Sequence, residues 1–368
     1  MTRIGRRWIR LVILVFTFTM VATTLAQQLK HKRVPAEWEP QEAVWLQWPG
    51  RYEKSHEVAF AKMAAIAVRY QKLHILYDSD SIQDEARAAI SKAGANPHDG
   101  NIVWHKFAND SAWMRDNGPV YVIEGDEMRV QNWHFNAWGG AFGSHVKYGS
   151  DNQVPASVAR YLGLSLDDVD IVHERGNLEF NGVDTVMLNW TTIGDHNRNP
   201  GYTRERAEVD LKREFGVSQV VFIEGAPKGD LTKGHIDGIA RFIDPTTVVV
   251  LDCAGATHCE DDSIFDAAAE TIEAAGFTVI REPSEGNASY GGTTFYTNYM
   301  NWAVGNGFVI VVGFGNPVTD MAAKERIEAY FPGRDVHVVE MLSSWASGGG
   351  AHCHTNDQPA ASTIATTP

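Results

Sequence analysis

The feature that most constrains the fold of this chain is a set of five short polar motifs spread at similar intervals. Their marker residues are Asp116, Glu174, His235, Asn301 and Cys353, and the successive separations are 58, 61, 66 and 52 residues. Near-even spacing of this kind indicates an internally repeated unit. We therefore expect each copy of the unit to deliver one polar group to a shared centre.

Hydrophobic periodicity between the motifs predicts alternating short strands and helices. The predicted helices are 58–70, 81–93, 156–162, 202–215, 262–275 and 321–330. The predicted strands lie within 38–49 and at 72–77, 101–104, 186–189, 220–223, 247–251, 279–281, 308–312 and 336–340. This alternation is typical of the α/β class. No Walker-type loop, Gly-x-Gly-x-x-Gly fingerprint or Gly-x-Ser-x-Gly elbow occurs, so nucleotide-binding and serine-hydrolase functions lose their usual signatures.

The first residues have the pattern of an export signal. Four arginines within the first ten residues precede an apolar run from Leu11 to Ala26, which ends in small residues. This order predicts a secretory signal peptide at 1–26 and a secreted or periplasmic protein. An uncleaved membrane anchor is the alternative, but the run is short for a span and contains four threonines. We further predict a linker at 27–33, a single domain at 34–358 and a disordered Ser/Thr/Ala/Pro-rich tail at 359–368; nothing after the leader approaches transmembrane length.

Net charge and cysteine content limit the possible partners of the chain and indicate a free thiol. The formal net charge is −14, so the phosphates of nucleic acid would be repelled, whereas a cationic substrate suits an acidic surface. Three cysteines in an exported chain leave one unpaired. Cys253 and Cys259 lie six residues apart and could close a small loop, which would leave Cys353 as a free thiol.

Cys353 follows three consecutive glycines, Gly348–Gly350, and is flanked by His352 and His354. Glycines let the backbone approach a ligand or another strand where a Cβ atom would collide. Cationic neighbours lower the pKa of a partly exposed thiol, and the thiolate is the nucleophilic form. The alternative is an inert buried cysteine.

Histidine and aspartate occur two residues apart at His235 and Asp237. If the segment is extended, the two side chains share one face, where His235 could act as acid and base while Asp237 binds a cation. The alternative is a zinc or iron site, supplemented by His352 and His354.

The remaining markers allow both functional and structural interpretations. Asp116 beside Trp113 could hold a planar cation through hydrogen bonds and cation–π contact, or it could cap its own turn. Glu174 could pair with Arg175 on the surface, and Asn301 could be a hydrogen bonder at a strand end. Taken together, the five motifs fit attack on a guanidinium carbon: carboxylates bind the nitrogens, a thiolate adds to carbon, and an imidazole protonates the departing ammonia. This chemistry requires no metal or organic cofactor.

Several rare motifs in order make the chain similar to a known family. They are Pro35-Ala36-Glu37-Trp38-Glu39-Pro40, Trp-x-Arg-Asp-x-Gly-Pro at 113–119, Phe135-Asn136-Ala137-Trp138-Gly139-Gly140, Gly234-His235-Ile236-Asp237, Tyr299-x-Asn301 as a strand, Gly313-Phe314-Gly315 and Gly-Gly-Gly…His-Cys. From about Pro35 to Pro359 the sequence resembles the agmatine deiminase and bacterial-type peptidylarginine deiminase family of guanidine-modifying enzymes, which have the pentein fold.

The resemblance implies a five-bladed α/β propeller with pseudo-fivefold symmetry around a central active site, and no cofactor or metal. It also implies roles for the matching residues: Cys353 is the nucleophile, His235 the acid and base, Asp116, Glu174 and Asp237 bind the guanidinium, and Trp113 and Asn301 contact the substrate. Two departures concern substrate identity. Arg175 stands where the family usually has glycine, and the nucleophile loop is one residue shorter than the common Gly-Gly-Gly-Asn-Ile-His-Cys.

The favoured function is therefore conversion of a guanidinium group to a ureido group plus ammonia. Agmatine, giving N-carbamoylputrescine for putrescine biosynthesis, is the favoured substrate, and peptidyl or free arginine, giving citrulline, is the alternative. The expected partner is thus a small cationic guanidinium compound or an arginine-containing peptide. Two further classes stay open: a metal-dependent hydrolase using His235, Asp237, His352 and His354, and a non-catalytic protein that captures cationic ligands.

Overall fold

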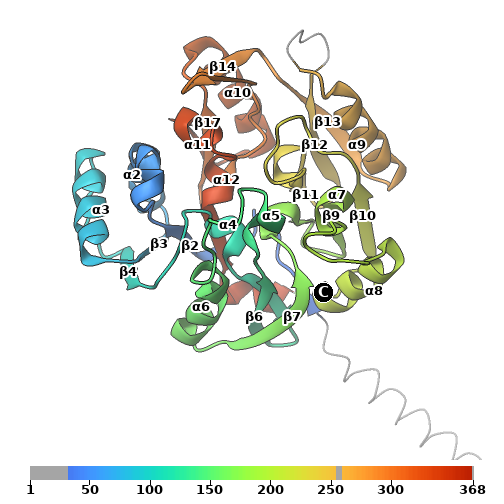
Figure 1. Cartoon of the computed structure of the whole chain (residues 1–368), viewed down its shortest axis with the longest axis horizontal. Coiled ribbons are helices and arrows are strands. Elements are labelled where there is room, and N and C mark those ends of the chain that lie inside the picture. Colours follow the sequence, from blue (N-terminus) through green and yellow to red (C-terminus); the bar gives the residue numbers. More distant parts are fainter. Residues whose placement is uncertain (1–31, 254–258, 367–368) are drawn as a thin grey trace, which may run out of the picture.

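The computed structural model describes residues 32–253 and 259–366, and the strands in these ranges form six sheets (Figure 1). Five of the sheets share one pattern: an antiparallel pair and a parallel pair have their middle strand in common. A helical connection joins the two parallel strands, as a parallel crossover requires. The α/β class and the internal repeat predicted from the sequence agree with this topology.

The first two sheets each gain a strand from a distant part of the chain. The first sheet has the order β19-β2-β3-β4. The strands and helices of this repeat are β2 (Gln41–Gln47), η1 (Arg51–His56), α2 (Glu57–Ala67), β3 (Lys72–Tyr77), α3 (Asp80–Lys92), β4 (Ile102–Lys106) and β19 (Thr355–Pro359). The second has the order β1-β5-β6-β7 and consists of β1 (Lys32–Arg33), α4 (Met114–Asn117), β5 (Val120–Glu124), β6 (Glu127–His134), α5 (Ala137–Gly140), η2 (Asp151–Gln153), α6 (Val154–Leu162) and β7 (Ser165–Val172).

The next two sheets are three-stranded. The repeat that contains the first of them consists of η3 (Arg175–Asn177), β8 (Glu179–Phe180), β9 (Thr185–Asn189), α7 (Trp190–Ile193), α8 (Arg204–Phe215) and β10 (Gln219–Ile223). The other consists of η4 (Ile236–Gly238), β11 (Ala240–Asp244), β12 (Thr247–Asp252), α9 (Asp262–Ala274) and β13 (Thr278–Pro283). In both, the middle strand pairs antiparallel with the first strand and parallel with the last.

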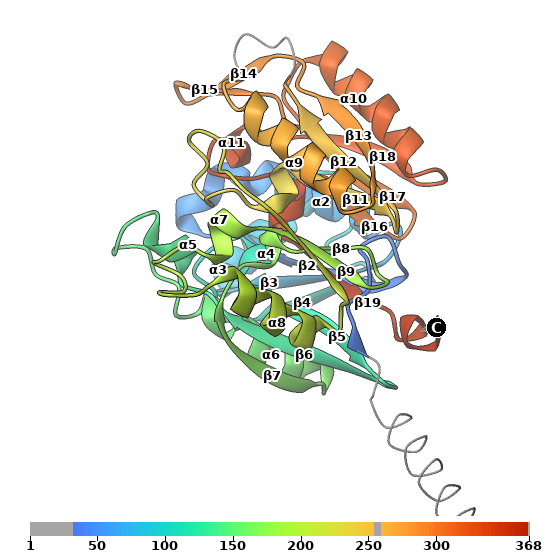
Figure 2. The ribbon, with the colours of Figure 1, turned by 90° about the vertical axis from the view of Figure 1, so that its right-hand side faces the viewer.

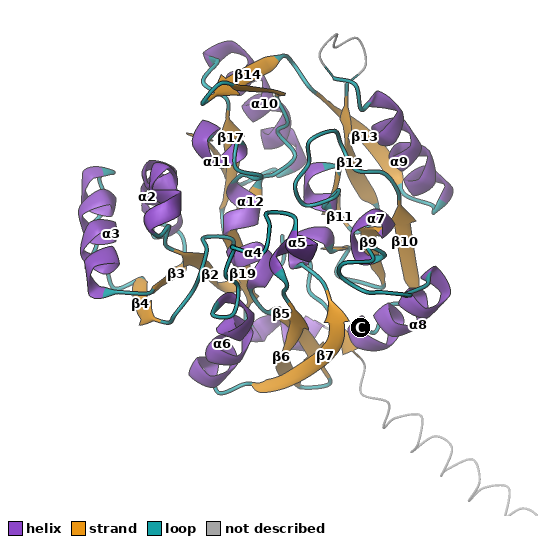
Figure 3. Ribbon diagram, viewed as in Figure 1, coloured by secondary structure: helices purple, strands orange, loops and turns teal. Residues whose placement is uncertain are grey.

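The last repeat follows a separate hairpin. The hairpin consists of β14 (Asn287–Tyr290) and β15 (Thr293–Tyr296), and the repeat consists of β16 (Ala303–Gly305), β17 (Phe308–Gly313), α10 (Pro317–Tyr330) and β18 (Asp335–Glu340). The chain then forms α11 (Leu342–Trp345), α12 (Ala351–His354), β19 and η5 (Ala361–Thr366). In Figure 3 the longer helices lie around the outside and the short helices α4, α5 and α12 lie in the middle.

Local sequence explains the main boundaries. The middle strands β9, β12 and β17 are buried along most of their length and are rich in valine and leucine, as expected of strands covered on both faces. Helix α8 begins after Thr203, whose hydroxyl accepts a hydrogen bond from the backbone N–H of Arg206, and it ends at Gly216 in the left-handed region. None of the helices in the described ranges combines the length and hydrophobicity that crossing a bilayer needs.

Each repeat carries its marker residue just before its first strand. Asp116 lies in α4 before β5, Glu174 immediately before η3 and β8, and His235 immediately before η4 and β11. Asn301 precedes β16, and Cys353 lies in α12 before β19. The same structural position therefore supplies one polar side chain in every repeat.

Most predicted elements are confirmed with shifts of a few residues at their ends, but several strands were missed. The β5–β6 hairpin is an example: its connection is Gly125-Asp126, a two-residue turn between the apolar run of β5 and the alternating residues that begin β6. Two local predictions are wrong. The His235–Asp237 segment is a 3₁₀ turn instead of an extended strand, and Asn301 lies outside the strand predicted for it.

Two boundary predictions are also wrong. Residues 32–33 of the predicted linker form β1, which pairs with β5, and residues 359–366 of the predicted disordered tail form the end of β19 and η5 (Figure 2). Buried Arg33 joins the two segments: its guanidinium donates to both carboxylate oxygens of Glu39 at 2.8 and 2.9 Å and to the carbonyl of Thr363 at 2.9 Å. The predicted signal peptide and residues 27–31 lie outside the described residues.

We expect Arg33→Ala to lower the free energy of unfolding by about 1–3 kcal/mol, because hydrogen bonds to charged groups contribute on that scale and their buried acceptors would lose their donor. Urea unfolding followed by circular dichroism measures the change. Lys72→Ala, which removes a half-exposed surface ion pair with Glu42, is the control and should change stability by no more than about 0.5 kcal/mol. Equal effects of the two substitutions would contradict this account of the chain ends.

Candidate active site

Cys353 is buried, with 3% of its surface exposed, and is held by Asn301. The side-chain carbonyl of Asn301 accepts from the backbone N–H groups of Gly350 and Cys353 at 3.0 and 3.3 Å. Its amide nitrogen donates to the Cys353 sulfur at 3.2 Å. Asn301 therefore fixes both the loop before the thiol and the thiol itself.

The glycines before Cys353 are required by close packing. A Cβ atom on Gly349 would lie 2.6 Å from the Cys353 sulfur and 2.8 Å from the Trp113 ring. A Cβ atom on Gly350 would lie 2.2 Å from Val312. The close approach inferred from the three glycines is thus present at two of them, and it lets the backbone pass directly beside the thiol.

The thiol faces negative charge. The Cys353 S–H group donates to the Asp237 carboxylate at 3.4 Å. Burial, followed by the charges of Asp237 and Asp116, raises the pKa of Cys353 well above its usual value. Burial also lowers the pKa of His352 and of His354, so neither flanking histidine is a cation. The expectation that they lower the thiol pKa is wrong for the site without a ligand.

His235 lies between two carboxylates from other repeats. Its Nδ1 is 3.5 Å from Asp116 Oδ1, and its Nε2 is 3.3 Å from Glu174 Oε2. Burial alone would lower the pKa of His235, but Asp116, Glu174 and Asp237 outweigh it and raise the pKa to about 9. His235 is therefore an imidazolium at neutral pH and carries a proton that it can donate.

Glu174 is fully buried and ionised. Arg198 Nε contacts its two oxygens at 2.9 and 3.0 Å, and His235 contacts one of them. Burial would raise the pKa of Glu174, but Arg198 and His235 outweigh burial and lower it to about 2. Because both oxygens are engaged, this geometry makes Glu174 the group that orients His235.

Asp116 has one oxygen held and one oxygen available. Its Oδ2 accepts from Trp138 Nε1 at 2.8 Å, whereas Oδ1, like His235 Nδ1, has no hydrogen-bond partner among the described residues. Burial, followed in the raising direction by Asp237 and Glu174, brings the pKa of Asp116 to about 7 despite the opposing effect of His235. A Cβ atom on Gly176 would lie 2.5 Å from Asp116 Oδ1 and 2.7 Å from His235 Nδ1, so glycine keeps this space open.

The structure separates the two histidines that flank the thiol. His352 Nδ1 lies 2.7 Å from Asp237 Oδ2, beside the site, whereas His354 contacts the carbonyl of Ala112 and the hydroxyl of Ser344. Within residues 32–253 and 259–366, no three His, Cys, Asp or Glu side chains are grouped so that they could hold a metal ion. The predicted combination of His235, Asp237 and both flanking histidines is therefore not assembled.

Trp113 supports the site from one side. Its ring stacks on His354 at a centroid distance of 4.4 Å and meets Trp138 edge-on at 6.2 Å. It belongs to the apolar cluster that contains Cys353. Trp113 and Asn301 thus both lie near the thiol, but of the two only Asn301 lines the cavity described next, and the predicted contact of both with substrate stays a prediction.

A cavity of about 240 Å³ leads to the thiol. At its base lie His235, Asp237, Asn301 and Cys353, and its outer part includes the side chains of Leu231, Phe295, Tyr296 and Trp345. Asp116, Glu174 and Trp113 do not line it. The cavity connects a nucleophile, a cationic acid and a carboxylate with an entrance that combines these apolar side chains with Lys228 and Asp230.

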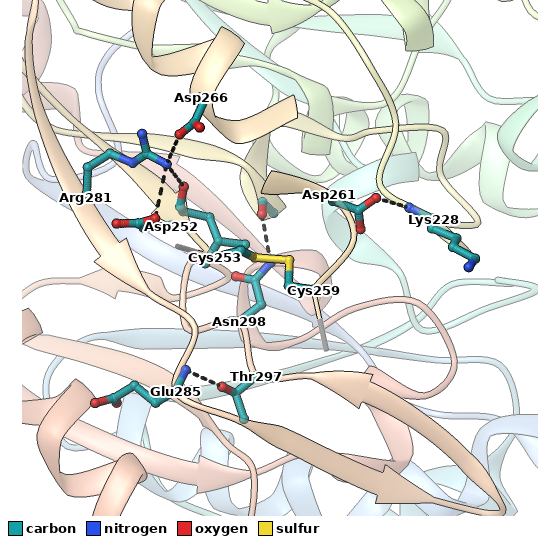
Figure 4. The surroundings of a disulfide bond; sticks show 12 residues. Lys228, Asp252, Cys253, Cys259, Asp261, Asp266, Arg281, Glu285, Thr297 and Asn298 are labelled. Atoms are coloured by element: carbon teal, nitrogen blue, oxygen red, sulfur yellow. Dashed lines mark hydrogen bonds and ion pairs between the residues drawn. A yellow bond between two sulfur atoms is a disulfide. The ribbon is translucent and has the colours of Figure 1, made fainter. Parts of the chain in front are cut away.

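A disulfide stabilises the segment beside this entrance (Figure 4). Cys253 and Cys259 are bonded, and Cys353 is the free cysteine, as one of the predicted pairings required. Two residues after Cys259, Asp261 accepts from the backbone N–H of Lys228 at 2.9 Å, and Lys228 lines the cavity. The disulfide thus lies two residues away from a contact that holds one of the cavity-lining residues.

A buried thiol, an imidazolium and several carboxylates that converge from repeated α/β units define a cysteine-dependent enzyme site suited to a cationic substrate. The chain matches the Porphyromonas-type peptidyl-arginine deiminase family over residues 33–359. It therefore belongs to that family of hydrolases, which includes the agmatine deiminases and has the pentein-like fold.

Individual relatives agree with this assignment. An agmatine deiminase of Pseudomonas aeruginosa is 27% identical to this chain, covering 89% of it and 95% of the relative. The agmatine deiminase structure from Enterococcus faecalis is 24% identical with a TM-score of 0.80, and the C. jejuni agmatine deiminase solved with substrate bound is 22% identical with a TM-score of 0.80. Each of the two structural matches covers 89% of this chain and 96% of the other chain; at these identities they support the fold.

Sequence reasoning missed the residues that support the predicted ones. Trp138 lies in a quoted motif, but nothing in the sequence connects it to Asp116; its backbone and that of Ala137 have positive φ, which directs the indole inward. Arg198 lies outside every motif, and no sequence signal pairs it with Glu174. Arg175 points away from the cavity and donates to both oxygens of Asp357 at 2.6 and 2.9 Å.

We expect Asp116→Asn to lower the pKa of His235 by roughly one to three units, because an opposite charge a few ångströms away shifts a pKa on that scale. The amide can still accept from Trp138, so the fold should persist. Histidine resonances of the ¹⁵N-labelled chain, followed against pH, measure the shift. Asp168→Asn removes a carboxylate near half-buried His134 and should leave His235 unchanged; an unshifted His235 in Asp116→Asn would contradict the assigned coupling.

Proposed function

We propose that this protein hydrolyses a terminal guanidinium group to a ureido group and ammonia, with Cys353 as the nucleophile and agmatine as the favoured substrate. The observation that carries the proposal is Asp116 Oδ1, which accepts no hydrogen bond among the described residues and lies 3.5 Å from His235 Nδ1, in a buried site that also holds Cys353 and Asp237. A buried carboxylate oxygen without a donor is costly unless a ligand supplies one. A guanidinium has the required charge and N–H groups.

Substrate binding also accounts for activation of the thiol. Burial, followed by the charges of Asp237 and Asp116, raises the pKa of Cys353 and keeps it protonated. A guanidinium between these carboxylates would offset their charge, and so it would lower the thiol pKa. The thiolate then forms, with its proton lost to solvent, only when the substrate is in place.

The chemical steps follow from the charges of the site. The thiolate adds to the guanidinium carbon, and the His235 imidazolium gives its proton to the nitrogen that leaves as ammonia. The resulting neutral imidazole takes a proton from water as the water oxygen attacks the S-linked amidino carbon. The carbon–sulfur bond breaks as the hydroxyl proton of the tetrahedral carbon is lost to solvent, and the neutral ureido product and the thiolate are released. Glu174 holds His235, and Asn301 holds Cys353, through these steps.

The cavity entrance favours agmatine over free arginine. Of the described residues that line it, none is an arginine, and its lysine, Lys228, pairs at the surface with Glu260. Among these described residues, the α-carboxylate of arginine would have to compete with Glu260 for Lys228. Burial, followed by the charges of Asp261 and Asp230, raises the pKa of Tyr296, and these two acids contribute negative potential at the entrance. A distal ammonium group is favoured by that potential.

Peptidyl-arginine is the second candidate. The family model that matches the chain is described as a peptidyl-arginine deiminase, and Leu231 presents an apolar, 38% exposed side chain at the entrance. A peptide would place an uncharged backbone where agmatine has its ammonium. Product formation from the two substrates distinguishes these candidates.

We further infer that the five repeats are the blades of an α/β propeller with pseudo-fivefold symmetry around this site. The shared strand order of the five sheets and the equivalent position of the five marker residues support this arrangement. We also propose that the mature protein is exported to a secreted or periplasmic location. The Cys253–Cys259 disulfide supports export, because such bonds persist in oxidising compartments.

We expect Cys353→Ala to reduce ammonia release from agmatine by roughly a thousandfold or more, because the covalent route loses its nucleophile. Ureido product and ammonia are measured with agmatine and with an arginine peptide. The double variant Cys253→Ala/Cys259→Ala is the matched control and should retain the reaction. Undiminished activity of Cys353→Ala would overturn the mechanism, and guanidinium binding by the wild type without ammonia would favour a binding protein.

The dependence of kcat/KM on pH should be bell-shaped, with limbs near pH 7 and pH 9. Asp116, with a pKa of about 7, must be ionised to bind a cation, so kcat/KM rises through that pH. His235, with a pKa of about 9, must be protonated to release ammonia, so kcat/KM falls above it. Initial rates from pH 5.5 to 10 test both limbs. A basic limb near 6.5 would mean that His235 is not held as a cation.

A further inference from the structure

His352 precedes the thiol in the chain but has no part in the chemical steps above. It is buried, 2% exposed, and its two ring nitrogens face two carboxylates. Nδ1 lies 2.7 Å from Asp237 Oδ2, and Nε2 lies 3.3 Å from Glu37 Oε2. Asp237 Oδ2 is also the oxygen that accepts the Cys353 S–H group at 3.4 Å. One carboxylate oxygen therefore joins the histidine to the nucleophile.

The surroundings of His352 hold its ring in place and keep it neutral. Glu37 is anchored by the backbone N–H of Val304 at 2.9 Å and by an ion pair with Arg241. Arg115 Nε donates to the His352 carbonyl at 3.2 Å. Burial, followed by the charges of Arg115 and Arg241, lowers the pKa of His352 well below its usual value despite the opposing effect of Asp237.

A neutral imidazole carries one proton, and the shorter contact locates it. The 2.7 Å separation between Nδ1 and Asp237 Oδ2 is a full hydrogen bond, whereas the Glu37 contact at 3.3 Å is longer. Nδ1 is thus the donor, and Asp237 is the acceptor. Burial would raise the pKa of Asp237, but this hydrogen bond is the first of the effects that lower it. His352 therefore keeps a buried carboxylate ionised beside a neutral thiol.

We propose that His352 is a positioning residue that holds the Asp237 carboxylate ionised and aimed at the substrate guanidinium, with Glu37 fixing the far side of its ring. This inference rests on the proposed function, because Asp237 lines the cavity and is one of the carboxylates proposed to bind the guanidinium. It also explains why the N-terminal Glu37 reaches the centre of the molecule. His352 itself does not line the cavity, so its influence passes through Asp237.

Two near-isosteric substitutions separate the two contacts of the ring. In His352→Asn the amide nitrogen can occupy the place of Nδ1 and donate to Asp237, whereas in His352→Gln it can occupy the place of Nε2 and reach only Glu37. His352→Leu removes both contacts. We expect KM for agmatine at pH 6.5 to stay within about threefold of wild type in His352→Asn and to rise roughly tenfold or more in the Gln and Leu variants, as loss of a hydrogen bond to a charged group implies.

The pH dependence of that increase distinguishes positioning from simple damage. Without the donor, the pKa of Asp237 rises, so a larger fraction of the carboxyl is protonated at pH 6.5 than at pH 8.5. The increase in KM should therefore shrink at pH 8.5 in His352→Gln. His354→Asn is the matched control, because that neighbouring buried histidine contacts Ser344 and Ala112 instead of Asp237; its KM should not show this dependence.

A second measurement does not require the proposed activity. In the full chain labelled with ¹³C at aspartate carboxyls and assigned with Asp237→Asn, the Asp237 titration should move upward by roughly one to three pH units in His352→Gln and stay low in His352→Asn. If wild type releases no ammonia from agmatine or an arginine peptide, the proposed function fails, while this titration still tests His352. Equal Asp237 titrations or equal KM values in the Asn and Gln variants would overturn the inference.

Discussion

The structure depends on keeping negative charge in a buried centre without neutralising all of it. Ionised carboxylates away from water are tolerated when each has a cation or hydrogen-bond donors. Glu174 has Arg198 and His235, and Asp237 has His352. Asp116 has the Trp138 indole on one oxygen and no hydrogen-bond donor on the other among the described residues. The deficit of positive charge is thus concentrated where a ligand would lie, and binding a cation relieves it.

The repeated fold makes such a centre possible because it gathers residues that are far apart in sequence. Each unit contributes its marker from the segment before its first strand, so five segments of the backbone converge on the site. Backbones can converge this closely only where side chains are absent, which is why Gly176 and Gly349 border the reactive groups. The glycines therefore matter for the space that they leave, and the acids for the charge that they bring to it.

The sequence predicted the repeat, the α/β class and which polar groups meet, because each signal is local: a hydrophobic period, or a rare motif. Roles that depend on direction were less accessible. Glu174 was predicted to bind the substrate, and that role stays a prediction, but the contact of both its oxygens with Arg198, which lies in no motif, could not be predicted. His352 and His354 look equivalent in the sequence. They lie about half a turn apart on α12, so their side chains point in different directions and only His352 contacts Asp237. Pairings across repeats are properties of the folded chain and leave no trace in local pattern.

Arg175 shows why direction decides the meaning of a sequence departure. Arg175 follows Glu174, and a cation that faced the cavity there would compete with the substrate for the carboxylates. In the 3₁₀ turn, however, Glu174 and Arg175 point to different sides, and Arg175 shares Asp357 with Arg115. Arg115 also donates to the His352 carbonyl. Arg175 therefore adds a second cation to buried Asp357, away from the carboxylates that face the cavity. The departure thus adds positive charge where the fold needs it and leaves the guanidinium position free.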